Sequence, residues 1–327
     1  MKKIITLFST LILLSSNANA FCLWDDTSHF IAWGDEEGVI KRKGEDLVDK
    51  NEALPLMMSR MKEIDKVDRI DAILHTGDFV RFDPDETYYT KFLDSFLDRF
   101  YPTSGGDQEF YLGRYGRFIN AVPHLKMLYT QRASTDGNGL EYYYHTIVKN
   151  THIVSLYSPD DFRDEENIQY KGQDVYSNTE SIQYKWLENL LFSIRKSKDE
   201  RPIIIISHGP VFNGSRILVK LFDKYKVNLV LNGDTHVFAH KKYNNTEYFV
   251  TGMMGDRYLG GCKELNSDKN PYYLEEYSEC FPENPITRKK GEKYYFAKDH
   301  YLDIKISKNT LKVKLIDLET GKEINYK

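Results

Sequence analysis

Four short apolar runs, each followed by glycine and polar residues, most strongly constrain how this chain can fold. They are residues 29–33 before Gly34-Asp35, 72–76 before Gly77-Asp78, 203–206 before Ser207-His208, and 228–231 before Asn232-Gly233-Asp234. Continuous apolar runs of four or five residues are typical of strands that are buried on both faces. Such strands need a further layer of structure on each side, so the runs favour a layered protein.

Segments with helical spacing of apolar residues separate these runs. The predicted helices are residues 47–64, which Pro55 interrupts, 88–100, 179–196 and 217–225. Ser177 or Asn178 is the expected N-cap of the third helix, because both side chains can accept a hydrogen bond from a first-turn amide. Strands that alternate with helices predict a layered α/β fold.

Two further pairs of alternating segments predict β-hairpins. One pair is residues 142–148 and 152–157, and the other is residues 301–306 and 311–316, turned at Ser307-Lys308-Asn309. We expect one main domain over residues 21–260. Residues 261–327 are expected to form a polar loop and C-terminal strands that pack on the same domain.

The first twenty residues have the pattern of a secretory signal peptide. Lys2 and Lys3 precede an apolar run over residues 4–14, and Ala18-Asn19-Ala20 is a small-x-small cleavage signal. The apolar run is shorter than the roughly 20 residues that a membrane span needs. We therefore expect an exported protein, periplasmic or secreted, with no membrane span after removal of residues 1–20.

An oxidising compartment would allow a disulfide bond between Cys262 and Cys280. Three free thiols, with Cys22 as the third, are the alternative.

Composition excludes several classes of protein. With 41% hydrophobic residues, 20 Gly and 10 Pro, the chain is neither disordered nor collagen-like. The 49 acidic and 45 basic residues give a formal charge of −4. Nucleic-acid binding depends on clustered excess Lys and Arg, so no nucleic-acid partner is expected.

The polar residues that follow the strands are the candidates for chemistry. The carboxyl ends of strands in an α/β sheet converge on one crevice, so residues just beyond them can share a site. The residues expected there are Asp35, Glu37, Asp78, Asp107, Gln108, Glu109, His208, Asp234 and His236. Carboxylates and imidazoles at this density are typical ligands of metal ions.

The order of these groups resembles the calcineurin-like metallophosphoesterases, especially their secreted branch similar to purple acid phosphatases. The motifs that carry the resemblance are Gly34-Asp35-Glu36-Glu37-Gly38, Gly77-Asp78, Gly106-Asp107-Gln108-Glu109, His208 and Gly233-Asp234-Thr235-His236. The resemblance extends over about residues 29–256. It implies a four-layer α/β/β/α sandwich with a C-terminal β-hairpin and a site for two metal ions.

The resemblance also implies a role for each matching residue. Asp78 would bridge the two ions, Asp35 and His236 would bind one of them, and His208 would bind the other.

Three positions depart from the family pattern toward carboxylates. Glu37 and Asp234 stand where the family usually has His, and Asp107 stands where it has Asn. All three can still bind metal through oxygen. The altered site is therefore expected to prefer Fe, Mn or another oxygen-preferring ion over zinc.

Gln108 is the sharpest departure, because the family places a general-acid His there, held by the carboxylate that here is Glu109. Gln has no titratable proton, so general-acid assistance of roughly 10²–10⁴-fold would be missing. Aryl phosphates, which have good leaving groups, should then be hydrolysed faster than alkyl phosphates. Equal rates would mean that His75, His240 or Glu109 supplies the proton.

These features predict an exported, metal-dependent phosphoesterase that acts on a phosphorylated small molecule or another phosphoester. The alternative is a binding protein that keeps the sandwich but has lost turnover. A secreted domain stabilised by calcium is a third interpretation, and it depends only on the number of carboxylates.

Overall fold

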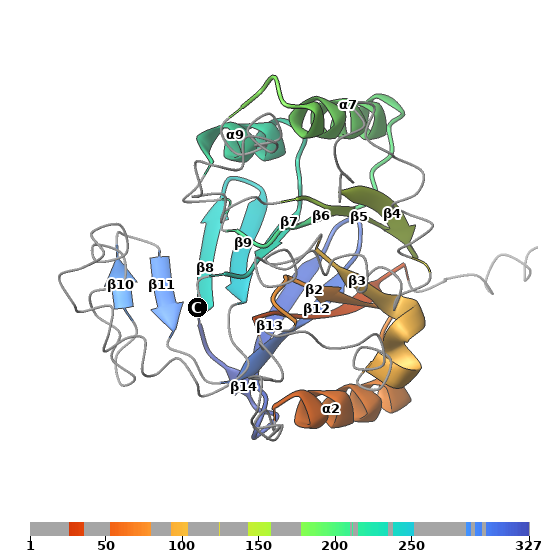
Figure 1. The fold of residues 1–327 in the computed structure, drawn as a ribbon, viewed down its shortest axis with the longest axis vertical. Coiled ribbons are helices and arrows are strands. Elements are labelled where there is room, and N and C mark those ends of the chain that lie inside the picture. Colours follow the sequence, from red (N-terminus) through yellow and green to blue (C-terminus); the bar gives the residue numbers. More distant parts are fainter. Residues whose placement is uncertain are drawn as a thin grey trace, which may run out of the picture.

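The computed structural model describes residues 26–35, 53–79, 93–103, 124, 143–157, 178–209, 211, 215–234, 238–251, 286–288, 292–295 and 299–326. Within these ranges two β-sheets lie face to face and helices cover their outer faces (Figure 1). The predicted signal peptide, Cys22, Cys262 and Cys280 lie outside the described residues.

The first sheet joins the two ends of the chain. Its order is β14 (Glu323–Ile324), β13 (Leu311–Asp317), β12 (His300–Ile306), β1 (Ser28–Trp33), β2 (Ala72–His75) and β3 (Phe100–Pro102). Strands β1, β2 and β3 are parallel, whereas β12 is antiparallel to β1, with Phe30 opposite Ile304. The predicted C-terminal hairpin, β12–β13, is therefore an integral part of this sheet.

The second sheet contains the middle of the chain. Its order is β10 (Ile286–Arg288), β11 (Glu292–Tyr295), β8 (Phe238–Tyr243), β9 (Thr246–Thr251), β7 (Leu229–Asn232), β6 (Ile203–Ile206), β5 (Thr151–Ser155) and β4 (Tyr144–Val148). Strands β5, β6, β7 and β9 run parallel. The predicted hairpin around residue 150 corresponds to β4 and β5.

The helices form the two outer layers. Helix α2 (Ala53–Val67) and the 3₁₀ helix η2 (Asp94–Arg99) cover the first sheet, and α7 (Ile182–Lys196) and α9 (Arg216–Lys224) cover the second (Figure 1). Pro55 falls in the first turn of α2, where its missing N–H costs no helical hydrogen bond. The N-cap predicted for α7 was wrong: Ser181 caps it by accepting a hydrogen bond from the backbone N–H of Tyr184.

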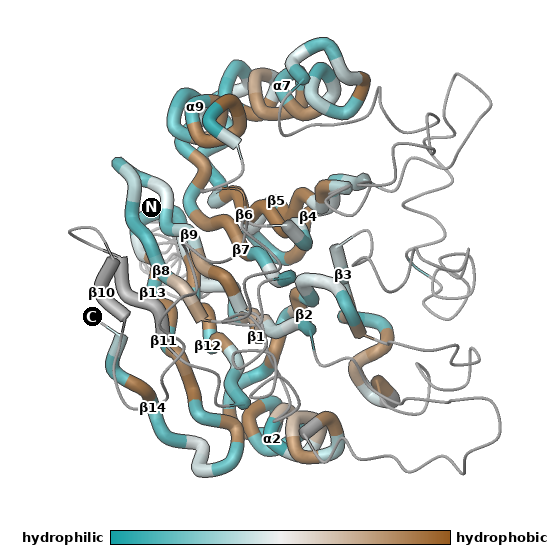
Figure 2. Tube along the Cα trace, turned by 60° about the vertical axis from the view of Figure 1, so that its left-hand side comes forward, coloured by the Kyte–Doolittle hydropathy of each residue, from teal (hydrophilic) through white to brown (hydrophobic). Residues whose placement is uncertain are grey.

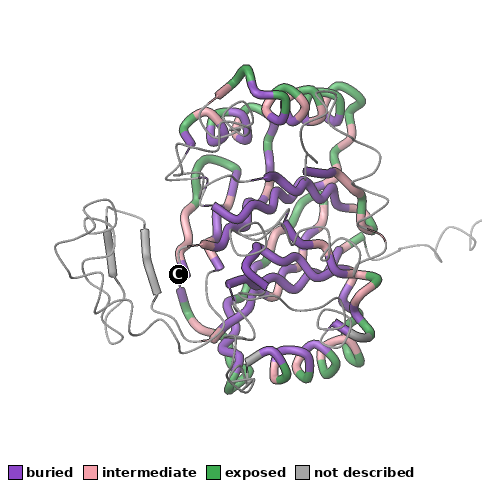
Figure 3. Tube along the Cα trace, in the orientation of Figure 1, coloured by how far each residue is buried: buried purple, intermediate pink, exposed green. Residues whose placement is uncertain are grey.

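Alternate residues of the strands fill different layers of the core. In β1, Phe30 and Ala32 pack between the sheets, whereas Ile31 and Trp33 pack in the layer that contains α2. In β6, Ile204 and Ile206 pack between the sheets and their neighbours pack toward α7 and α9. The inner strands are accordingly buried and largely apolar (Figures 2 and 3). The predicted four-layer α/β sandwich is confirmed.

The hairpin of β8 and β9 was not predicted from the sequence. These antiparallel strands are joined at Asn244-Asn245, where Asn244 has a φ of 50°. Asn is favoured in two-residue hairpin turns because it tolerates positive φ, so a signal for this turn was present. Across the ranges that the structure describes, no helix is both long enough and apolar enough to cross a membrane.

Candidate metal centre

Four strand ends, two from each sheet, meet at one place. Asp35 follows β1 and Asp78 follows β2 in the first sheet, while His208 follows β6 and Asp234 follows β7 in the second. All four strands end on the same side of the sandwich, as expected for carboxyl ends of neighbouring parallel strands. Residues that are up to 199 positions apart in sequence are thereby brought together.

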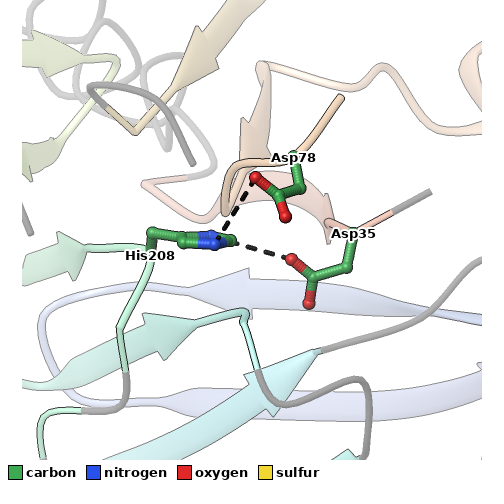
Figure 4. Close-up of side chains that lie close together, drawn as sticks. All are labelled: Asp35, Asp78 and His208. Carbon is green, nitrogen blue, oxygen red and sulfur yellow. Dashed lines mark ion pairs between the residues drawn. The ribbon is translucent and has the colours of Figure 1, made fainter. Parts of the chain in front are cut away.

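Asp35, Asp78 and His208 form a compact buried group, in which one potential ligand atom from each lies within 4.8 Å of the others (Figure 4). The Nε2 atom of His208 is 3.5 Å from Oδ1 of Asp78, and its Nδ1 atom is 3.6 Å from Oδ1 of Asp35. The three side chains are at most 3% exposed. Asp234 is 30% exposed, with Oδ1 3.9 Å from Nε2 of His208, so it lies at the open side of the group.

The three aspartates share an unusual backbone conformation. The φ angles of Asp35, Asp78 and Asp234 are 60°, 55° and 69°, in the left-handed region. Asp enters this region more readily than most residues that carry a side chain, but the conformation still has a cost. Strained backbone of this kind is concentrated at functional sites. Here it occurs at three residues that each follow the end of a strand.

Two glycines allow the strand ends to approach closely. A Cβ atom on Gly34 would lie 2.0 Å from Oγ1 of Thr76, and one on Gly233 would lie 2.8 Å from Oδ1 of Asp35. Both positions therefore require glycine because a neighbouring side chain occupies the space.

Backbone hydrogen bonds connect the four loops. The N–H of Asp35 donates to the carbonyl of Gly77 over 2.9 Å, and the N–H of Gly233 donates to the carbonyl of His208 over 2.8 Å. The N–H of Asp234 donates to Oδ1 of Asp35 over 3.1 Å, which links the two sheets directly. The site is therefore built from loops that support one another.

The orientation of the His208 ring is set by Thr76. The Nδ1 atom lies 2.8 Å from the backbone oxygen of Thr76. A carbonyl oxygen can only accept, so Nδ1 carries the proton and Nε2 is the nitrogen that faces Asp78. A hydrogen bond at one ring nitrogen commonly selects the tautomer of a metal-binding His. No sequence pattern indicates this role of Thr76, because its contribution comes from the backbone.

The donor set fits a metal ion. Two buried carboxylates and an imidazole lie within reach of a common point, with a third carboxylate at the rim. Buried charges in proteins are usually paired or bound to metal. Oxygen and imidazole donors together suit Mn or Fe ions, among other divalent metals.

Five of the predicted site residues lie outside the described residues. They are Glu37, Asp107, Gln108, Glu109 and His236. Their roles therefore stay predictions, as do the individual ligand roles of Asp35, Asp78, His208 and Asp234.

His75 and His240, named above as alternative proton donors, are engaged elsewhere. His75 is buried at the end of β2 among Trp33, Phe79 and Phe100, and its Nδ1 accepts a hydrogen bond from Gly77. His240 lies within β8, and its Nε2 is 2.7 Å from Oε2 of Glu247.

The sequence model of a family described as calcineurin-like phosphoesterase matches residues 46–238. The match includes the positions of Asp78, His208 and Asp234. No curated protein sequence matches the chain.

Two solved structures are similar over most of the chain. GAP50, the anchor in the inner membrane complex of Plasmodium, is 12% identical with a TM-score of 0.54, covering 91% of this chain and 87% of GAP50. The purple acid phosphatase PPD1 from seeds of yellow lupin (Lupinus luteus) is 16% identical with a TM-score of 0.53. That match covers 91% of this chain and 53% of the lupin protein, so the chain spans about half of the lupin protein's length. At these identities the likeness shows a shared fold.

Proposed function

Because the chain belongs to the calcineurin-like phosphoesterase family, we propose that it is a metal-dependent hydrolase of phosphate esters. The observation that carries this proposal is the buried group of Asp35, Asp78 and His208 at the meeting point of four strand ends. Such a group provides a binding site for cations at the edge of two sheets, where an ester can approach from the open side near Asp234.

The proposed cofactor is a pair of oxygen-preferring metal ions, such as Fe and Mn, rather than zinc. Asp35, Asp78 and His208 would hold them together with Asp234 and the predicted ligands Glu37, Asp107 and His236. Bound ions of this kind polarise a phosphoryl group and lower the pKa of water. The chain itself orients the His208 ring through the carbonyl of Thr76 and keeps water away from the buried carboxylates.

Gln108 shapes the proposed substrate preference. Since Gln cannot donate a titratable proton to a leaving alkoxide, esters whose leaving groups need no proton should react best. We therefore propose aryl phosphates or phosphoanhydrides as better substrates than alkyl phosphates. The pattern of residues 1–20 supports an exported protein that acts in the periplasm or outside the cell.

A non-catalytic role is the alternative. Gln108 and Asp234 replace residues that support catalysis in the family, and the similar fold of GAP50, an anchor in a membrane complex, supports a binding function. The carboxylates of Glu37, Asp107 and Asp234 at the altered metal-ligand positions favour the enzyme, because they can still bind metal.

The test combines metal content with hydrolysis of 4-nitrophenyl phosphate and an alkyl phosphate. We expect the wild type to bind Mn²⁺ and to hydrolyse the aryl ester faster. Asp78→Asn should abolish both properties, and Gln108→His should raise the rate on the alkyl ester. The matched control is Asp98→Asn, since the side chain of Asp98 is 80% exposed in η2. Absence of both metal and turnover in the wild type would overturn the enzyme proposal.

A further inference from the structure

We infer that Asn232 is a positioning residue for His208, an inference that rests on the proposed function of His208 as a metal ligand. Asn232 is the last residue of β7 and is 1% exposed. The hydrogen bonds of its side-chain amide go to backbone groups of the loop that contains His208. Asn232 therefore acts on His208 through the backbone of this loop.

The Asn232 side chain holds the loop on both sides of His208. Its Nδ2 donates to the carbonyl of Ser207 over 3.1 Å and to the carbonyl of Gly209 over 2.8 Å. Its Oδ1 accepts from the N–H of Val211 over 3.3 Å. One amide group therefore satisfies three backbone groups of a single loop.

The adjacent residue completes this connection. The N–H of Gly233 donates to the carbonyl of His208 over 2.8 Å. The carbonyls of three consecutive residues, 207 to 209, thus all accept hydrogen bonds from residues 232 and 233. Because Asp234 follows directly, the loop with His208 and the loop with Asp234 form one hydrogen-bonded unit.

Only an amide of this length supplies what the position requires. Two N–H donors face two carbonyls, and one oxygen faces a backbone N–H. Aspartate has the same shape but no donor at neutral pH, so it would place negative charge against two carbonyl oxygens. Without these donors the buried carbonyls of Ser207 and Gly209 would lack hydrogen bonds, so the loop would no longer be held in place. The hydrogen bond from His208 Nδ1 to the Thr76 carbonyl would then lose its geometry.

The experiment compares Asn232 with a second asparagine, which lies just before β7. Asn228 lies at the opposite ends of β6 and β7, where its Oδ1 accepts from the N–H of Ile203 over 2.9 Å. The variants are Asn232→Asp, the smaller and uncharged Asn232→Ser, and the controls Asn228→Asp and Asn228→Ser. The probe is Mn²⁺ alone, and the readouts are its dissociation constant and the ¹⁵N NMR shifts of the His208 ring in metal-free protein.

We expect both Asn232 variants to bind Mn²⁺ about 10–100-fold more weakly, as is typical when support of a ligand is removed. In the metal-free wild type, His208 should show a protonated Nδ1, and the Asn232 variants should show a mixture of tautomers. The Asn228 variants should match the wild type in both measurements.

Two results would overturn the inference. One is an unchanged His208 ring signal in both Asn232 variants, and the other is an equal loss of Mn²⁺ affinity in the Asn228 controls. A wild type that binds no Mn²⁺ would refute the proposed function instead, and the NMR comparison of metal-free protein would still decide the role of Asn232.

Discussion

Asp35 accepts a hydrogen bond from the backbone N–H of Asp234, with Oδ1 3.1 Å from the nitrogen. The two residues follow strands of different sheets, so this bond ties the sheets together at the candidate metal centre. One carboxylate thus serves both as a candidate ligand and as a structural acceptor. Substitutions at Asp35 can separate these two roles.

Asp35→Asn should remove the charge and keep the structure. Asn tolerates the left-handed φ of 60° as Asp does, and its oxygen can still accept from Asp234. Relief of repulsion from Asp78 should leave the metal-free protein as stable as the wild type or up to about 1 kcal/mol more stable. Affinity for Mn²⁺, measured by calorimetry, should fall by at least tenfold.

Asp35→Ala is the matched comparison. Ala has no side-chain acceptor for the N–H of Asp234 and is disfavoured at positive φ. The free energy of unfolding should therefore fall by about 2 kcal/mol. Equal stability of the two variants in urea denaturation would contradict the structural role of the Asp35 oxygen.

Gly34→Ala should destabilise the protein through Thr76. The added Cβ would lie 2.0 Å from Oγ1 of Thr76, which cannot be accommodated without movement. Overpacking of this kind typically costs about 1–3 kcal/mol. Thr76→Ala removes the closest of these contacts and leaves those with Cβ of Thr76 at 3.1 Å and the carbonyl of Gly77 at 3.3 Å, so it should recover part of the loss. A double-mutant cycle by thermal unfolding measures the coupling, and strictly additive effects would exclude the contact.

His29 should make stability depend on pH near neutrality. Burial by itself lowers the pKa of His29, but the hydrogen bond and charge of Asp303, with the charge of Asp68, raise it above its ordinary value. The folded state then binds the proton more tightly than the unfolded state. The stabilisation is complete below pH about 6.5 and is lost as pH rises through the raised pKa.

His29→Gln tests this dependence. The variant should be less stable than the wild type at pH 5.5, by on the order of 1 kcal/mol, and the difference should shrink at pH 8.5. Urea denaturation at both pH values provides the comparison. A difference that is constant with pH would show that the charge of His29 contributes nothing.

His152 should make stability depend on pH in the opposite direction from His29. Burial lowers its pKa, and this outweighs the hydrogen bond to Asp199 at 3.1 Å. The unfolded state therefore binds the proton more tightly, and stability falls as pH decreases from about 6.5 through the lowered pKa. His152→Gln should flatten the stability profile on this acid side and leave the dependence due to His29 unchanged.

Arg195 should stabilise the junction of α7, α9 and β6. Its guanidinium donates to the carbonyls of Tyr225 at 2.8 Å, Lys226 at 2.9 Å and Asp199 at 2.9 Å. Lys cannot reproduce this planar set of donors. Arg195→Lys should therefore lower the free energy of unfolding by about 2 kcal/mol. The neighbouring exchange Lys196→Met is the control, and an equal effect of both would contradict the prediction.

Much of the fold followed from local patterns. The apolar runs of β1, β2, β6 and β7 are buried on both faces, and apolar periodicity located α7 and α9. These signals are strong because each depends on residues close together in sequence. The β8–β9 hairpin was missed because its strands mix polar and apolar residues, with His240, Lys241 and Lys242 in β8.

The amino-acid sequence by itself determined which polar residues stand at the ends of the apolar strands, and hence the kinds of ligand available. The family resemblance added the expectation of two facing sheets and a shared site. Only the tertiary structure decided that β1 pairs with β12, and that Asp35 and Asp78 come from one sheet and meet His208 from the other as a buried group. It also decided the supporting roles of Thr76 and Asn232. The physical reason is that these contacts join segments far apart in the chain, whose packing is specified by the whole core and by no local pattern.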